Sequence, residues 1–184
     1  MSTQRVSDDV NMIDAPYHGR TGVLGTYVVA GEKVAVIDPG PVSQVPSVIK
    51  ALDRLGVKEV STIALTHIHL DHAAGCWMML ERYPGAEVHC HPRGVDHMVD
   101  PSKILAAARE AFGDKIEEYG EIRGIPREKL KTSVDGERLC LAASSSRSST
   151  RLATPSTAKA TTSPRAGCSS PETRRGTHQT TWEW

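Results

Sequence analysis

The chain has 184 residues, which suits a single domain, and its 22 Lys and Arg residues balance its 22 Asp and Glu residues. No apolar stretch approaches the roughly 20 residues that a membrane-spanning helix needs, so we expect no membrane role. The four cysteines have no short paired spacing, and the start lacks the basic and then apolar segment of a secretory signal. We therefore expect a cytoplasmic, reduced protein.

The first part of the chain predicts a strand followed by a helix. Residues 34–37 are apolar and form a buried strand that ends at Asp38. Ser43 is predicted to cap a helix that ends at Gly56. Apolar residues recur at helical spacing between them: Val45, Val48, Ile49, Leu52 and Leu55. This helix should cover one face of a sheet.

A short apolar run over residues 63–65, typical of a buried strand, is followed directly by three histidines and an aspartate. In an extended segment His67, His69 and Asp71 can point the same way, and a turn then brings His72 beside them. Zinc accepts imidazole and carboxylate ligands, and iron or manganese also tolerate them. A surface turn that is rich in histidine by chance is the alternative. Four candidate ligands in so short a stretch favour a metal site.

The elements after this motif continue the alternation of strand and helix. Cys76 begins an apolar helical stripe that stops at Pro84, so its side chain is predicted to lie in the core. Residues 87–90 predict a short strand, residues 102–119 a longer helix with one apolar side, and residues 135–141 a hairpin strand. This order is typical of a layered α/β domain.

Three further polar positions have competing interpretations. His89 and His91 flank Cys90 and could suggest a second metal site, but no third ligand is evident, and a structural role is favoured. His18 lies in a loop that contains glycines. For its side chain we favour an exposed position over one that faces substrate. Asp38 could be a turn residue or a partner that holds a ligand imidazole, and the sequence supports both roles equally.

Residues 143–184 have a different composition, with 9 Ser, 9 Thr, a single Leu and no Val, Ile, Phe, Met or Tyr. Such a segment buries too little apolar surface to offset the entropy cost of ordering, so a disordered tail is expected. Its charge is +4 against −4 for residues 1–142. We therefore predict a folded domain over 1–142 and a Ser/Thr-rich basic tail over 143–184. A linker or a nucleic-acid-binding arm would also fit this composition, but six scattered cations argue against nucleic acid.

The stretch His67-Ile68-His69-Leu70-Asp71-His72, followed by Gly75, resembles the signature of the metallo-beta-lactamase superfamily, and glyoxalase II-like thioesterases are similar. Upstream, residues 25–30 and 34–40 resemble the opening hairpin of that family and its Asp-X-Gly loop. The resemblance extends to about Leu141. It implies the N-terminal half of a metallo-beta-lactamase-like αββα sandwich over residues 1–142.

The resemblance also implies roles for the motif. His67 and His69 would bind a first metal ion together with a downstream histidine, and Asp71 and His72 would bind a second ion. Metal-activated water would attack an ester, thioester or similar bond of a small-molecule substrate, and Asp71 would orient that water or relay its proton. Asp38 would support a ligand. Zinc is the default ion, up to two divalent ions fit the intact family, and iron or manganese are alternatives.

A shifted reading frame would also explain the tail. The codons of residues 167–176, read from each third base, can encode Val-Leu-Phe-Thr-Gly-Asp-Ala-Ala-Gly, which resembles the family's bridging-aspartate strand. The same shift over residues 154–161 permits a stretch that ends in His-Ser-Lys-Gly-His, similar to the loop with the next metal-binding histidine. We therefore hypothesise that the tail is the family's second half translated out of frame, with the slip near residues 141–148.

This interpretation limits the expected activity. The downstream ligands of the family are missing from the in-frame sequence, so we expect this chain to be poorly folded or inactive, although its lineage is enzymatic. Lactonase, phosphodiesterase or ribonuclease chemistry is the alternative within the superfamily. A non-enzymatic metal-binding remnant, or a binding protein with a basic tail, is the alternative from a different class.

Overall fold

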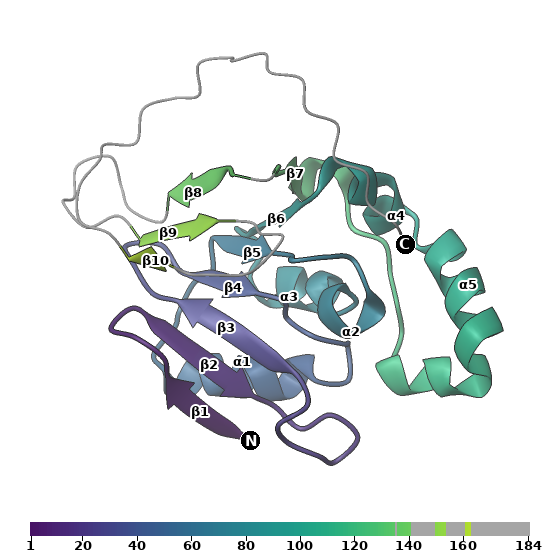
Figure 1. Cartoon of the computed structure of the whole chain (residues 1–184), viewed down its shortest axis with the longest axis horizontal. Helices are drawn as coiled ribbons and strands as arrows, with labels where there is room; N and C mark the ends of the chain where they lie inside the picture. Colours follow the sequence, from purple (N-terminus) through teal and green to yellow (C-terminus); the bar gives the residue numbers. More distant parts are fainter. Residues whose placement is uncertain (135, 141–149, 154–160, 163–184) are drawn as a thin grey trace.

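The computed structural model describes residues 1–134, 136–140, 150–153 and 161–162 (Figure 1). The strands are β1 (Ser2–Arg5), β2 (Val10–Asp14), β3 (Gly25–Val29), β4 (Ala35–Ile37), β5 (Thr62–Ala64), β6 (Glu87–Cys90), β7 (Leu130–Thr132), β8 (Arg138–Cys140), β9 (Thr150–Ala153) and β10 (Thr161–Thr162). The helices are α1 (Val45–Arg54), α2 (Leu70–Ala73), α3 (Cys76–Arg82), α4 (Val95–Val99) and α5 (Ser102–Phe112), with 3₁₀ segments η1 (Pro92–Gly94), η2 (Gly113–Tyr119) and η3 (Arg127–Lys129).

The central element is a seven-stranded sheet whose strands lie in chain order from β1 to β7. β1 to β4 pair antiparallel, and β4 to β7 pair parallel. The register aligns Val36 with Ile63 and Val88 with Leu130. Helices connect the parallel strands, as such crossovers require. The carboxyl ends of β4, β5 and β6 therefore meet at one edge of the sheet.

Helices α1 and α3 cover one face of this sheet, as the sequence pattern predicts (Figure 1). Val48 and Leu52 of α1 and Met79 of α3 are almost fully buried and belong to the same core cluster as the strand residues Val36 and Ile63. Burial of this kind is the main favourable contribution to folding. Cys76 also lies in this core with no exposed surface, so its predicted position is confirmed.

The opposite face of the sheet is only partly covered by described residues. Val10, Val29 and Ala35 are buried there, and Leu139 of β8 packs against them. β8 belongs to a second sheet of three strands in the order β10-β9-β8. Tyr27 on β3 is 39% exposed. The main sheet thus has helices on one face and a short second sheet near the other.

Three details differ from the predictions. The first residue before α1 is Gln44 and not Ser43, and no side chain caps this helix; Pro46 in the first turn supplies the fixed backbone angle instead. The predicted helix over residues 102–119 ends at Phe112, because Gly113 adopts φ +58° and starts the 3₁₀ segment η2. The strand before the histidine motif is Thr62–Ala64, one residue earlier than predicted.

Two short segments of the predicted tail, β9 and β10, are strands. The other tail residues lie outside the described part of the chain, and so do the proposed slip near residues 141–148 and the two motifs of the shifted frame. Among the described residues, every helix is too short or too polar to cross a lipid bilayer.

Candidate metal centre

The histidine motif lies where the parallel strands end. The backbone N–H of Asp38, just after β4, donates to the carbonyl of Ala64 at the end of β5, and the N–H of Leu65 donates to the carbonyl of His89 on β6. These bonds continue the sheet for one further residue. The chain then leaves the sheet as a loop over residues 66–69 and enters α2 at Leu70. The predicted ligands therefore follow the carboxyl ends of buried strands.

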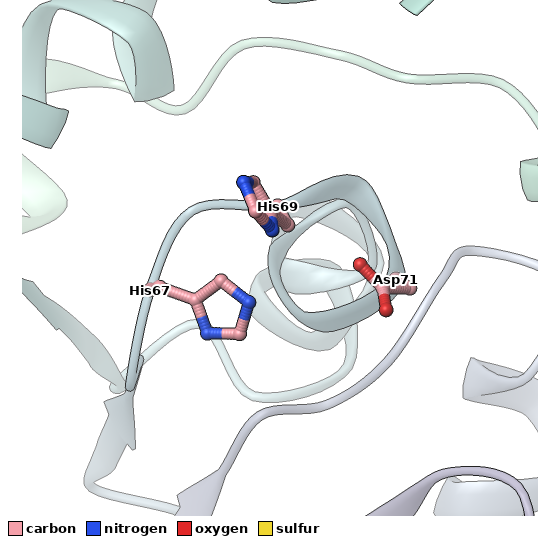
Figure 2. Close-up of side chains that lie close together, drawn as sticks. All are labelled: His67, His69 and Asp71. Carbon is pink, nitrogen blue, oxygen red and sulfur yellow. The ribbon is translucent and has the colours of Figure 1, made fainter. Parts of the chain in front are cut away.

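Three predicted ligands converge at this edge. One donor atom from each of His67, His69 and Asp71 lies within 4.8 Å of the other two. Figure 2 shows that His67 comes from the loop and Asp71 from the first turn of α2. The ring centroids of His67 and His72 are 4.1 Å apart, so His72 is also close. The extended geometry predicted for the motif is wrong at Asp71, because the helix begins one residue before it.

The donor set fits a divalent metal ion. Two imidazoles and a carboxylate are borderline ligands of the kind that zinc binds at about 2.0–2.2 Å. Ligands of one zinc ion are therefore at most about 4 Å apart, close to the spacing found here. The two histidines are exposed and Asp71 is half-buried, so the cluster faces solvent. Small rotations of exposed side chains would close the remaining distance.

Asp38 connects two of the histidines. Its side chain is buried, and its Oδ1 accepts the backbone N–H of Thr66 at 2.8 Å. Its Oδ2 accepts the Thr66 hydroxyl at 2.6 Å and lies 3.1 Å from Nδ1 of His72. Asp38 adopts φ +49°, a left-handed conformation that aspartate tolerates better than most residues. The carboxylate thus contacts the metal motif at two points.

Thr66 extends this network to His67. Its hydroxyl oxygen lies 2.9 Å from Nδ1 of His67. Because Thr66 has one hydroxyl hydrogen and donates it to Asp38, its oxygen must accept the bond from His67. Nδ1 of His67 therefore carries the hydrogen, and Nε2 keeps the lone pair that a metal ion requires. A carboxylate that orients a ligand imidazole is a recurring arrangement in metal sites.

His72 lies between two carboxylates, with Nδ1 at 3.1 Å from Asp38 and Nε2 at 3.3 Å from Asp71. The hydrogen bond to Asp38, then that to Asp71, raises the pKa of His72 to about 9. The same pairing lowers the pKa of Asp71. Burial, followed by the charges of His72 and His69, lowers the pKa of His67. The cluster thus favours neutral imidazole at His67 and a carboxylate at Asp71, the forms that bind metal, whereas His72 is protonated near neutral pH and must lose a proton before its Nε2 can bind an ion.

Gly75 allows the motif to lie close to the loop after β4. Its N–H donates to the carbonyl of Gly40 at 2.9 Å, and the N–H of Gly40 donates to the carbonyl of His72 at 3.1 Å. A Cβ atom at residue 75 would lie against Val45 and 2.7 Å from the Gly40 carbonyl oxygen. A residue without a side chain is therefore required at this point.

Two tyrosines that the sequence analysis did not assign to the site lie beside it. Tyr119, at the end of η2, lines a cavity together with His69 and Asp71. The ring of Tyr17 lies 6.2 Å from that of Tyr119. Burial, followed by a hydrogen bond to Tyr119, raises the pKa of Tyr17. The apolar side of the predicted helix included Tyr119, but no local pattern identifies Tyr17.

The remaining candidate residues have other partners. Nδ1 of His89 lies 3.0 Å from the hydroxyl of Ser133, and Nδ1 of His91 accepts the N–H of Arg93. Nδ1 of His18 lies 3.2 Å from a carboxylate oxygen of Glu118. These contacts account for the three imidazoles without a metal ion.

The fold and the cluster define a layered α/β protein in which two histidines and an aspartate that could hold a metal ion lie at the carboxyl edge of parallel strands. Residues 18–141 match the family model of the metallo-beta-lactamase superfamily. The chain belongs to this superfamily. A probable metallo-hydrolase of Methanocaldococcus jannaschii is 27% identical over 97 residues, which are 53% of this chain and 46% of that protein.

Solved structures share the fold at low sequence identity. An archaeal metallo-beta-lactamase superfamily protein from Sulfolobus tokodaii has a TM-score of 0.64 and 23% identity, covering 79% of this chain and 54% of its own. The FEZ-1 metallo-beta-lactamase from Legionella gormanii has a TM-score of 0.61 and 17% identity, covering 83% and 52%. The chain thus spans about half the length of the relatives it matches. The predicted fold, the N-terminal half of an αββα sandwich, is confirmed.

Proposed function

We propose that this chain carries the first part of the metal centre of a hydrolase that cleaves an ester, thioester or similar bond of a small molecule. The observation that carries the proposal is the convergence of His67, His69 and Asp71 within 4.8 Å at the carboxyl edge of the sheet. The sequence resemblance to glyoxalase II-like thioesterases favours a thioester among these bonds. Buried, unpaired Cys76 and Cys90 favour a reducing, cytoplasmic location.

The residues of the site suit distinct tasks. A bound divalent ion, which we propose to be zinc, would supply a water of lowered pKa and would polarise the scissile carbonyl group. His67 presents Nε2 to the ion because its Nδ1 is committed to Thr66. Asp38 holds Nδ1 of His72, so Nε2 is the nitrogen that faces Asp71 and the ion. Asp71 is proposed to bind the ion and to orient the attacking water or accept its proton.

We also propose that this chain hydrolyses its substrate slowly. Within the part of the chain that the structure describes, His67, His69 and Asp71 form the group of three that could hold an ion, and His72 lies beside them. Two-metal hydrolases hold both the attacking and the leaving oxygen between two ions. Four ligands are too few for two ions. We therefore expect the chain to bind one zinc ion and to hydrolyse esters slowly.

Zinc binding and hydrolysis should be measured together on the full chain. Competition with a chromophoric chelator gives the zinc stoichiometry and affinity, and release of a chromophore from aryl esters and thioesters gives the rate. His67→Ala and Asp71→Ala should each weaken zinc binding at least tenfold and remove any zinc-dependent rate. His91→Ala is the control, because this imidazole is exposed and its Nδ1 accepts the neighbouring backbone N–H of Arg93.

Each outcome has a distinct meaning. A zinc-dependent rate that His67→Ala abolishes supports the hydrolase, and one zinc ion without turnover supports a metal-binding remnant. Two zinc ions with appreciable turnover would contradict the predicted inactivity. Reading the coding DNA across residues 139–176 then tests the origin of the tail. A neighbouring frame with a His-containing loop and a Phe-Thr-Gly-Asp strand would support a frameshift.

A further inference from the structure

A cavity of about 600 Å³ opens beside the ligand cluster. His69 and Asp71 line it on the metal side. Helix α5 contributes another wall through Ile104, Ala107 and Ala111, which recur at intervals of three and four residues and so share one face of the helix. Phe112 follows at the end of the same helix. The cavity is thus continuous with the proposed metal site and has a largely apolar lining.

The apolar face of α5 is not used to build the core. Among the described residues of this helix Ala108 alone is buried, whereas Ala107 and Ala111 are exposed and Phe112 is 56% exposed. Alanines in place of larger residues leave room against Ile68 and Leu70 on the opposite wall. An apolar face that stays open beside polar catalytic groups is the usual form of a ligand site.

The lining also disfavours an anionic ligand. Among the described residues that line the cavity, the polar side chains are His69, Asp71, His97 and Tyr119, and none is Lys or Arg. Apart from the ion proposed at His69 and Asp71, a phosphate group placed along α5 would meet no fixed cation. Phosphate recognition normally uses Arg, Lys or a bound metal ion. An uncharged, apolar group is therefore the better match.

We propose that this cavity binds the aliphatic acyl chain of the substrate, so that the substrate is an ester or thioester of a medium-chain carboxylic acid. The proposal rests on the hydrolase function proposed above. The acyl carbon would lie at the ligand cluster and gain the oxygen of water, while its bond to the leaving oxygen or sulfur breaks and the leaving group takes a proton. The remaining atoms of the chain would extend along α5.

The volume supports this substrate class. Cavities that bind small molecules measure roughly 300–1,000 Å³, so 600 Å³ accommodates an acyl chain together with part of its leaving group. Each buried methylene group strengthens binding by about fourfold, from the free energy of transferring it out of water. Selectivity should therefore rise with chain length until the cavity is filled.

The test measures the binding of 1-octanol and 1-butanol to the full chain by isothermal titration calorimetry. These probes are uncharged and need no metal ion, so the result does not depend on activity. Four additional methylenes, at about fourfold each, set an upper limit of about two hundredfold. Because the cavity is open on one side, we expect 1-octanol to bind at least tenfold more tightly than 1-butanol.

Substitutions on α5 locate the site. Ala111→Phe fills the cavity and should weaken 1-octanol binding at least fivefold, and Ala107→Phe provides a second change on the same face. Ala106→Phe is the control, because Ala106 is exposed on the same helix and does not line the cavity. Circular dichroism confirms that each variant is folded.

Equal affinity for the two alcohols would overturn the proposal. Equal binding by the Ala111→Phe and Ala106→Phe variants, with both folded, would overturn it as well. If 1-octanol binds as expected but no zinc-dependent hydrolysis is found, the hydrolase function fails and the apolar site stands. If hydrolysis occurs with no dependence on acyl length, the function stands and the acyl site fails.

Discussion

Replacing Asp38 by Asn tests whether one carboxylate orients two of the metal ligands. The amide oxygen can still accept the backbone N–H of Thr66, but the amide NH₂ replaces the oxygen that accepts the Thr66 hydroxyl and contacts His72. If the amide flips, the bond to the backbone N–H is lost instead. Loss of a partner that orients a ligand typically costs 10–100-fold in metal affinity, or about 1.4–2.7 kcal/mol.

The same change should destabilise the metal-free protein. Hydrogen bonds to a charged group contribute about 1.5–3 kcal/mol each, and bonds that share one carboxylate do not add fully. We therefore expect Asp38→Asn to lower the free energy of unfolding by about 2–4 kcal/mol. Thr66→Val removes the hydroxyl alone and should weaken zinc binding less than Asp38→Asn. Thr62→Val is the control, because the Thr62 hydroxyl lies at the opposite end of β5 and makes a marginal contact of 3.5 Å with the Ser61 hydroxyl.

Chelator competition measures the zinc affinity of the three variants, and urea unfolding measures their stability. If Asp38→Asn binds zinc within twofold of the Thr62→Val control, the carboxylate does not orient the ligands and the argument from Asp38 is refuted. A loss of stability without a loss of zinc affinity would make Asp38 a purely structural residue.

Two further predictions concern the support of the site and its pH dependence. Gly75→Ala should destabilise the protein by about 1–3 kcal/mol, because the new Cβ would meet Val45 and the Gly40 carbonyl; Gly85→Ala, in open space, should change urea unfolding by less than about 0.5 kcal/mol. Burial lowers the pKa of His89, so the unfolded chain binds the proton more tightly than the folded one. Stability should fall as the pH drops below about 6.5, the ordinary pKa of histidine, and His89→Gln should flatten that part of the pH profile in chemical denaturation. An unchanged profile would show that His89 does not contribute.

Much of the fold and the clustering of His67, His69 and Asp71 could be predicted because their signals are local. The apolar periodicity of α1 and α3 and the short run at β5 identify the buried faces directly, and the histidine motif is contiguous. Its local conformation was predicted less well. Asp71 lies on a helix and not on an extended segment, because α2 begins at Leu70, and periodicity alone does not locate such a boundary.

The parts that the sequence did not reveal depend on contacts between distant segments. Asp38 reaches Thr66 across 28 residues, and a single sequence gives no reason to prefer that pairing to a simple turn. Tyr17 and Tyr119 meet beside Asp71 for the same reason. The stripe on α5 was correctly recognised as apolar. Whether such a stripe packs or lines a cavity depends on what lies opposite, and here much of it stays exposed.

Among the described residues, the contacts that orient the predicted ligands His67 and His72 come from the first part of the fold. Asp38 and Thr66 hold His67 and His72, and Gly40 is bonded to both ends of the turn from His72 to Gly75. Ligand orientation therefore does not require the rest of the family's domain, whereas a two-ion hydrolase does. Zinc affinity and turnover, which are usually lost together, are therefore separable in this chain. The chain should bind a zinc ion with an affinity that Asp38→Asn reduces, even if its turnover is negligible.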